Sequence, residues 1–341
     1  MVDALLRELE LRRVEIADST VETIYFGGGT PSLLAAADID RLIQKIASLA
    51  TVTSDVEITL EANPDDLTEA KVAQLAATRV NRLSIGIQSF FEEDLRFFNR
   101  AHTAEEAEIC VQRAQRAGFD NLTIDLIYGS PTTDDDRWRA NLERAFALDV
   151  PHLSCYCLTV EEGTALHHFV RTGRAQPVDE ARAARQFDLL LEMTTAAGYE
   201  QYEISNFARP GAYSRHNSAY WTGTPYVGIG PSAHGFNGQQ RYWNVAHNAQ
   251  YMTQIEAGEL PQELEVLSAD DRYNEYVLTA LRTRWGVTME RLHAFGAVAH
   301  FAQLAQPYLE AGKMELTDGA YRLTAQGKFL ADGIAAALFR V

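Results

Sequence analysis

The sequence has few cysteines and no long apolar run. Only three cysteines occur in 341 residues, Cys110, Cys155 and Cys157, without the even number and regular spacing of a secreted disulfide scaffold. No apolar run approaches the roughly 20 residues that a membrane-spanning helix needs. We therefore expect a reducing compartment and a cytoplasmic location.

Basic residues are also outnumbered by acidic ones. Thirty Lys and Arg stand against 47 Asp and Glu, which gives a formal net charge of −17. Such a charge repels a phosphate backbone, so nucleic acid is not expected as a partner. A hydrophobic content of 46% and a charged content of 23% are ordinary for a globular chain with room for one large α/β domain and a smaller one.

Short β-branched runs alternate with helical stretches over residues 1–205. Strands are expected at 21–26, 56–61, 82–88, 122–128, 152–158 and 202–205. Helices are expected at 3–18, 37–50, 104–117, 137–147 and 180–197. This alternation is typical of parallel βαβ units, and their number predicts an α/β fold that forms a partial (βα) barrel.

Three consecutive glycines, 27–29, follow the first expected strand and precede Thr30. Their main-chain N–H groups are unshielded and could hold a carboxylate, although a tight turn without a ligand is the plainer interpretation. Polar residues stand at or near the ends of later, otherwise apolar strands: Glu61, Gln88, Asp125 and Tyr156. In a β/α barrel these ends form the rim that carries the active site, so the combination favours a ligand site.

The segment 206–266 has a different character, and we expect it to be a loop segment and linker on the ligand side. It is rich in Gly, Pro, His and aromatic residues, above all in 215–221 and 225–235. Imidazole is a good iron ligand, and the rings of Tyr220 and Trp221 could cover a flat macrocycle such as haem. For His216, residue types alone favour a hydrogen-bonded histidine packed against Trp221.

Residues 267–341 are expected to form a separate C-terminal domain. Helices are predicted at 272–282, 288–295 and 301–311, a hairpin at 314–323 around Asp318-Gly319, and a last helix at 325–339. Helices followed by a two-stranded wing resemble a winged helix. The acidic chain favours a packing or docking role for this α+β domain over DNA binding.

At this point the motifs carry a family resemblance that covers nearly the whole chain. The matching stretches are 25–32 (YFGGGTPS), 60–64 (LEANP), 84–89 (SIGIQS), 99–102 (NRAH), 125–129 (DLIYG), 158–161 (LTVE), 216–221 (HNSAYW) and 228–234 (GIGPSAH). They resemble the radical S-adenosylmethionine proteins related to oxygen-independent coproporphyrinogen III oxidase. More narrowly, they are similar to the haem chaperones of that family.

The resemblance implies two binding sites. S-adenosylmethionine would be held by residues on the strand ends and the glycine loop: Gly28, Gly29, Thr30, Glu61, Gln88, Arg100 and Asp125. Haem would be bound by His216 through its iron, in the family's His-Asn-x-x-Tyr-Trp motif. The implied function is a haem chaperone that delivers haem to acceptor proteins such as respiratory haem enzymes, which would bring it to the membrane periphery. One alternative is a coproporphyrinogen III oxidase-like enzyme of porphyrin biosynthesis, and another is a non-catalytic docking protein in which both sites are relics.

One departure from the family pattern concerns the [4Fe-4S] cluster. The family carries a first strand and a Cys-x-x-x-Cys-x-x-Cys loop that are not found in this sequence, so we expect no cluster of the family type here. Cys155 and Cys157 share one strand face and are interpreted, with Cys110, as buried apolar-like residues. Either the chain is truncated or the homologue has lost the cluster; the unprotected edge of strand 21–26 favours truncation.

Overall fold

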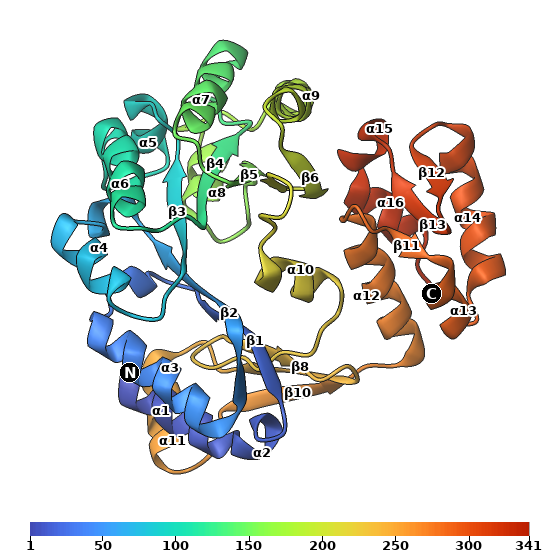
Figure 1. The fold of residues 1–341 in the computed structure, drawn as a ribbon. Helices are drawn as coiled ribbons and strands as arrows, with labels where there is room; N and C mark the ends of the chain where they lie inside the picture. The colour runs from blue at the N-terminus through green and yellow to red at the C-terminus, as the bar shows by residue number, and fades with distance from the viewer. Residues whose placement is uncertain (341) are drawn as a thin grey trace. The chain divides into compact units, whose positions relative to one another are not determined.

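The computed structural model describes residues 1–340, which form a mixed α/β protein (Figure 1). Its largest sheet is a curled half-barrel with the strand order β1-β2-β3-β4-β5-β7-β6. Neighbours from β2 to β5 are parallel, and β7 runs antiparallel to both β5 and β6. The strands are β1 (Thr20–Phe26), β2 (Thr51–Ala62), β3 (Arg82–Gln88), β4 (Leu122–Tyr128), β5 (His152–Cys157), β6 (Glu200–Glu203) and β7 (Asn206–Ala208). The partial barrel predicted from the alternation is confirmed.

Helices follow the strands of this sheet along the chain. They are α4 (Glu69–Ala76), α5 (Glu92–Phe97), α6 (Ala104–Arg116), α7 (Asp135–Ala147), α8 (Ala165–Arg171) and α9 (Glu180–Ala196). Figure 1 shows α5, α6 and α7 beside β3 and β4. Tyr128 of β4 contacts Trp138 of α7 and Phe187 of α9, with ring centroids 5.5 and 6.3 Å away. The apolar core of this part of the chain therefore lies between the sheet and its helices.

The opposite face of the same strands is polar. Thr123 of β4 accepts a hydrogen bond from Arg82 of β3, and its Oγ1 lies 3.0 Å from Nδ1 of His152 of β5. Nε2 of His152 lies 2.8 Å from the Tyr202 hydroxyl of β6. Burial, together with Arg82, lowers the pKa of His152 well below its ordinary value, so the ring is neutral at pH 7. The sequence predicts largely apolar strands here, but in β3, β4 and β5 the apolar side chains gather on the face that the helices cover, and the other face carries these polar side chains.

Contacts divide the chain into two compact units, which are described separately. The first contains residues 1–24, 34–57 and 214–341, and the second contains 25–33 and 58–213. The domain boundaries expected after residues 205 and 266 remain a prediction. In the described part of the chain, no helix combines the length and the apolar character needed to cross a membrane.

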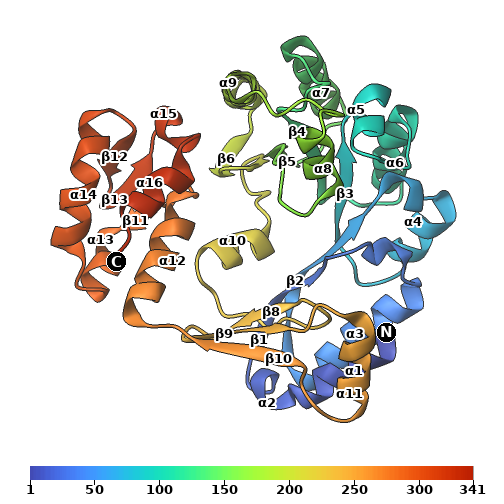
Figure 2. The same cartoon turned by 180° about the vertical axis from the view of Figure 1, so that it is seen from behind.

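In the first unit, α1 (Val2–Leu11) packs against α3 (Ala36–Leu49) and α11 (Asn248–Glu256), as Figure 2 also shows. The single helix expected at 3–18 is instead divided into α1 and α2 (Arg13–Ile16). The buried carboxylate of Glu8 accepts hydrogen bonds from Arg12, Asn244, Tyr251 and the N–H of Gly230. This network joins α1 to the 228–244 segment without an unpaired carboxylate oxygen.

The range expected as loop and linker contains regular structure. Besides β7 and α11, it includes α10 (Arg215–Trp221), β8 (His234–Phe236), β9 (Gln240–Asn244) and β10 (Gln262–Val266). The strands β8, β9 and β10 form an antiparallel sheet. Packing explains its Gly228, because a Cβ there would lie 1.9 Å from the main-chain oxygen of His234.

The C-terminal region is an α+β arrangement, as expected. Its elements are α12 (Ala269–Leu281), β11 (Val287–Thr288), α13 (Met289–Ala294), α14 (Val298–Glu310), β12 (Met314–Thr317), β13 (Ala320–Leu323), α15 (Ala325–Lys328) and α16 (Ala331–Ala337). The hairpin around Asp318-Gly319 is confirmed. The prediction of one continuous last helix is wrong, since α15 and α16 are separate. At Gly327 of α15 the chain approaches Lys313 so closely that a Cβ would lie 2.0 Å from its carbonyl oxygen.

Candidate functional site

The glycine loop after β1 meets the end of β2. Gly28 donates its N–H to Oε2 of Glu61 at 3.1 Å, and the Tyr25 hydroxyl donates to Oε1 at 2.7 Å. Gly28 and Gly29 have φ angles of 76° and 70°, and a Cβ on either would meet no heavy atom within 4 Å. Main-chain N–H groups and a carboxylate therefore border open space at this strand end, which suits the ammonium and carboxylate of an amino acid.

A second group of predicted residues gathers at the end of β3. Nη2 of Arg100 donates to Oδ1 of Asn63 at 2.6 Å and to the carbonyl of Gly86 at 2.9 Å. Gln88 has a φ of 69° and lies where the register between β3 and β4 shifts. A Cβ at Gly86 would meet the side-chain nitrogens of Gln88 and Arg100 at 2.8 and 3.2 Å, so glycine is needed for these two side chains to lie together.

Asp125 lies in the middle of β4, on the polar face that also carries Thr123. It is the fourth of seven strand residues and pairs in register with Ser154 of β5, so it is set back from the strand end. Burial and the nearby Glu61 raise the pKa of Asp125 to about 7, although Arg82 and a hydrogen bond from Ser154 act in the opposite direction. The charge of Glu61 therefore acts on Asp125, which places the two carboxyl groups near each other.

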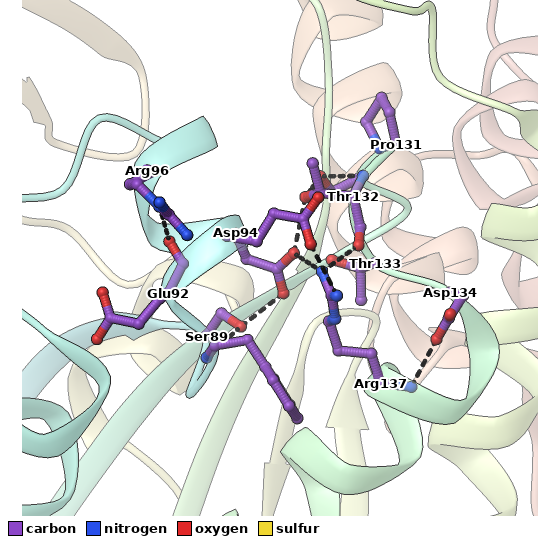
Figure 3. Close-up of polar contacts among 12 residues, drawn as sticks. Ser89, Glu92, Asp94, Arg96, Pro131, Thr132, Thr133, Asp134 and Arg137 are labelled. Carbon is purple, nitrogen blue, oxygen red and sulfur yellow. Dashed lines mark hydrogen bonds and ion pairs between the residues drawn. The ribbon is translucent and has the colours of Figure 1, made fainter.

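The loop that leaves β3 is fixed by a buried carboxylate (Figure 3). Asp94 of α5 accepts hydrogen bonds from Ser89 and Thr132, each at 2.7 Å, and from Nη1 of Arg137 at 3.1 Å. Ser89 follows Gln88 directly in the chain. The network therefore fixes the main chain next to a predicted site residue, and it joins α5 to the loop between β4 and α7.

The three cysteines lie away from this polar face. Cys110 is buried in α6. Cys155 and Cys157 pair in register with Leu126 and Tyr128, so they point to the helix-covered side of the sheet. Burial raises the pKa of all three thiols, to about 12 for Cys110. Across residues 1–340, no three His, Cys, Asp or Glu side chains come together as a metal site would require.

His216, the predicted haem ligand, belongs to the first unit and lies near the start of α10. Its Nδ1 is 2.9 Å from the Thr23 hydroxyl of β1. Its main-chain N–H donates to Oε1 of Glu57 of β2 at 3.0 Å. The ring of His216 is therefore hydrogen-bonded, with Thr23 as its partner, and its packing against Trp221 stays a prediction.

Aromatic side chains extend from the end of α10. Tyr220 is half exposed and contacts Trp221 and Tyr226, with ring centroids 5.4 and 5.5 Å away. The guanidinium of Arg282 lies over the Trp221 ring at 5.2 Å. Tyr220 is four residues after His216, so both side chains lie on one side of this short helix.

Several contributing residues were not predicted from the sequence. Tyr25 donates a hydrogen bond to Glu61, Asn63 accepts one from Arg100, and the charge of Arg82 acts on Asp125. Thr23 and Glu57 hold His216. A signal was present for Tyr25, since it sits inside the glycine motif, and for Arg82, a charged residue at the start of an apolar run. Thr23 and Glu57 carry no comparable local signal.

Two family models match the chain. The model described as "Radical SAM superfamily" matches residues 2–145, and the model described as "HemN C-terminal domain" matches residues 267–330. The first covers Glu61 and Gln88 at the strand ends, Asp125 in the middle of β4, and the glycine loop, and the second covers most of the C-terminal α+β region.

Curated relatives match over nearly the full length. "Heme chaperone HemW" of Mycobacterium tuberculosis is 36% identical over 332 residues, which cover 97% of this chain and 84% of the relative. The protein of the same name from Bacillus subtilis is 31% identical over 342 residues, covering 98% and 90% respectively. Among solved structures, coproporphyrinogen III oxidase (HemN) from Escherichia coli superposes with a TM-score of 0.83 at 24% identity, over 99% of this chain and 82% of that one. At this identity the structural likeness shows the fold alone.

Proposed function

The chain belongs to the radical SAM superfamily and, within it, to the family of proteins named heme chaperone HemW, and from this premise we propose that it binds haem through His216 and transfers it to acceptor haem proteins. The proposal rests on His216, which begins the motif at 216–221 and lies near the start of α10. Its ring and its main chain are both hydrogen-bonded, and Tyr220 lies on the same side of α10. The cytoplasmic location expected from the sequence is part of this proposal.

The radical SAM family implies S-adenosylmethionine and a [4Fe-4S] cluster. For the first of these, the residues at the strand ends fit. Gly28 and Glu61 would hold the methionyl end together with Gly29 and Thr30, and Asp125 would accept from the ribose hydroxyls. Arg100 and Gln88 would complete the site, as their shared position beside Gly86 supports.

The described cysteines do not fit the cluster, because Cys155 and Cys157 face the helices and Cys110 is buried in α6. When both are bound, the reduced cluster and S-adenosylmethionine together would provide the chemistry for radical hydrogen abstraction. We expect that treating this chain with iron and sulfide yields no stoichiometric cluster and no release of 5'-deoxyadenosine. A [4Fe-4S] absorption spectrum with one cluster per chain would contradict this expectation.

The haem proposal is tested by titrating haem into the protein and into His216→Ala while the Soret band is recorded. We expect a saturable band for the native chain and a loss of at least about tenfold in affinity for the variant. His168→Ala is the matched control, since His168 is exposed on α8, and it should bind as the native chain does. Equal binding by His216→Ala would refute the assignment of the ligand.

A further inference from the structure

We propose that Thr23 and Glu57 are positioning residues that set the strength and geometry with which His216 holds haem iron. The inference rests on the proposed function and deepens it. Thr23, Glu57 and His216 all belong to the first compact unit, although they are far apart in the sequence. Thr23 lies on β1 and Glu57 on β2, so two strands of the sheet each contribute a side chain that contacts α10.

The first contact acts on the imidazole ring. The hydroxyl of Thr23 lies 2.9 Å from Nδ1 of His216. This contact restrains the orientation of the ring. In the tautomer in which Nδ1–H donates to the hydroxyl, Nε2 would be the atom that holds the iron. Threonine suits this task because its branched Cβ restricts the side chain to few rotamers, which holds the hydroxyl in one direction.

The second contact acts on the main chain of α10. The buried carboxylate of Glu57 accepts the N–H of Arg215 through Oε2 and the N–H of His216 through Oε1, both at 3.0 Å. The hydroxyl of Ser214 donates to the same carboxylate at 3.4 Å. These are N–H groups that a helix start leaves without internal partners, and a negative charge there is favoured by the helix dipole.

The length of α10 makes this anchoring necessary. A helix of seven residues is well below the roughly 12 to 15 residues at which an isolated helix becomes marginally stable. Arg215 adds two more bonds to β2, since its Nη1 donates to the main-chain oxygen of Asp55 at 2.5 Å and to the carboxylate of Asp55 at 3.2 Å. The orientation of His216 therefore depends on bonds to the sheet, and Glu57 supplies two of them directly to the first turn.

The experiment compares Thr23→Val, which keeps the shape and removes the hydroxyl, with Thr23→Ser, which keeps the hydroxyl. Glu57→Gln is the second variant. Exposed residues of β1 supply matched controls with the same chemical changes, Thr20→Val and Glu22→Gln. For each haem-loaded variant, the rate of haem loss to excess apomyoglobin and the iron–histidine stretching band of the ferrous form are measured. The melting temperature of the haem-free protein is recorded beside them.

We expect Thr23→Val and Glu57→Gln to lose haem at least about tenfold faster and to shift the iron–histidine band. Thr23→Ser should restore both readouts, and the two controls should match the native chain. A purely structural role would lower the melting temperature and leave the band unchanged. If Glu57→Gln does not fold, the two Thr23 variants decide the result, because they differ in the hydroxyl.

Two outcomes overturn the inference and are distinguishable. If His216→Ala loses haem while Thr23→Val and Glu57→Gln keep the native rate and band, the positioning role is refuted and the proposed haem ligand stands. If His216→Ala binds haem as the native chain does, both the proposed ligand and the positioning role are refuted.

Discussion

At the scale of single residues, Asp125 combines a structural cost with a proposed binding role. Burial and the charge of Glu61 raise its pKa from an ordinary value of 3.8 to about 7. An unfolded chain would release this proton near pH 4, whereas the folded protein retains it until about pH 7. The unfolded state is therefore favoured progressively as the pH rises from about 4 to 7, and the penalty stays constant above that range.

We predict that Asp125→Asn removes this penalty. Its free energy of unfolding should exceed that of the native protein at pH 8, and the difference should shrink as the pH falls towards 4. Urea unfolding of both proteins across this pH range is the measurement, with the exposed Asp120→Asn as the control for loss of one charge. A difference that is independent of pH would show that the carboxyl is not perturbed in the folded state.

The residues around His216 also show where sequence reasoning ends. The identity of His216 as a candidate came from its aromatic neighbours and from a motif. Its partners are 193 positions away at Thr23 and 159 positions away at Glu57, and no local pattern marks either one. Such pairs arise only when the fold brings β1 and β2 to α10, so they are not readable from one sequence.

At the scale of elements, α5 is joined to the loop before α7 by the carboxylate of Asp94. We predict that Asp94→Asn lowers the free energy of unfolding by about 2 kcal/mol, because a buried charge that accepts three hydrogen bonds is replaced by an amide with one acceptor oxygen. Asp136→Asn, an exposed position on α7, is the control and should change stability by less than about 0.5 kcal/mol. Denaturant unfolding measures both.

If Asp94→Asn were as stable as the native protein, the network in Figure 3 would contribute nothing net to folding. In that case Ser89 and Thr132 would be equally well satisfied by an amide.

Most long elements could be predicted, and the short ones could not. The range expected for β4 agrees at both ends, and β3 does as well, because apolar, β-branched runs bounded by polar residues are strong signals. The three-residue strands β7 and β8 were missed, since a run that short has no period. The break between α15 and α16, at Phe329 and Leu330, was missed as well, since no Gly or Pro at these two positions marks it in the sequence.

At the scale of the whole molecule, the net charge of −17 favours a packing or docking role over DNA binding for the winged-helix-like C-terminal region. We predict that the protein does not retard duplex DNA in a gel at near-physiological salt, because the summed field repels phosphate. A complex whose affinity falls steeply with added salt would contradict this prediction. The docking role of residues 267–341 would then need to be replaced by a nucleic-acid role.

The family could be predicted from the sequence because many short motifs agree with it at once. Its motifs lie at the ends of separate strands and in α10, and each is short, but together they extend from residue 25 to residue 234. Chance agreement over so many separate stretches is rare, and the curated relatives confirm the resemblance over 97% of the chain. The residue roles within those motifs remain proposals.

The two-sided strands β3 to β5 have a consequence for how this protein can change over evolutionary time. Leu153 and Cys155 support the fold from the helix side, whereas Ser154 between them faces the polar side. Adjacent residues of β5 are therefore selected for different properties, one for packing against the helices and the next for its polar contacts. Along β5, tolerance to substitution should alternate with a period of two, and new ligand preferences could accumulate on one set of positions while the other set keeps the chain folded.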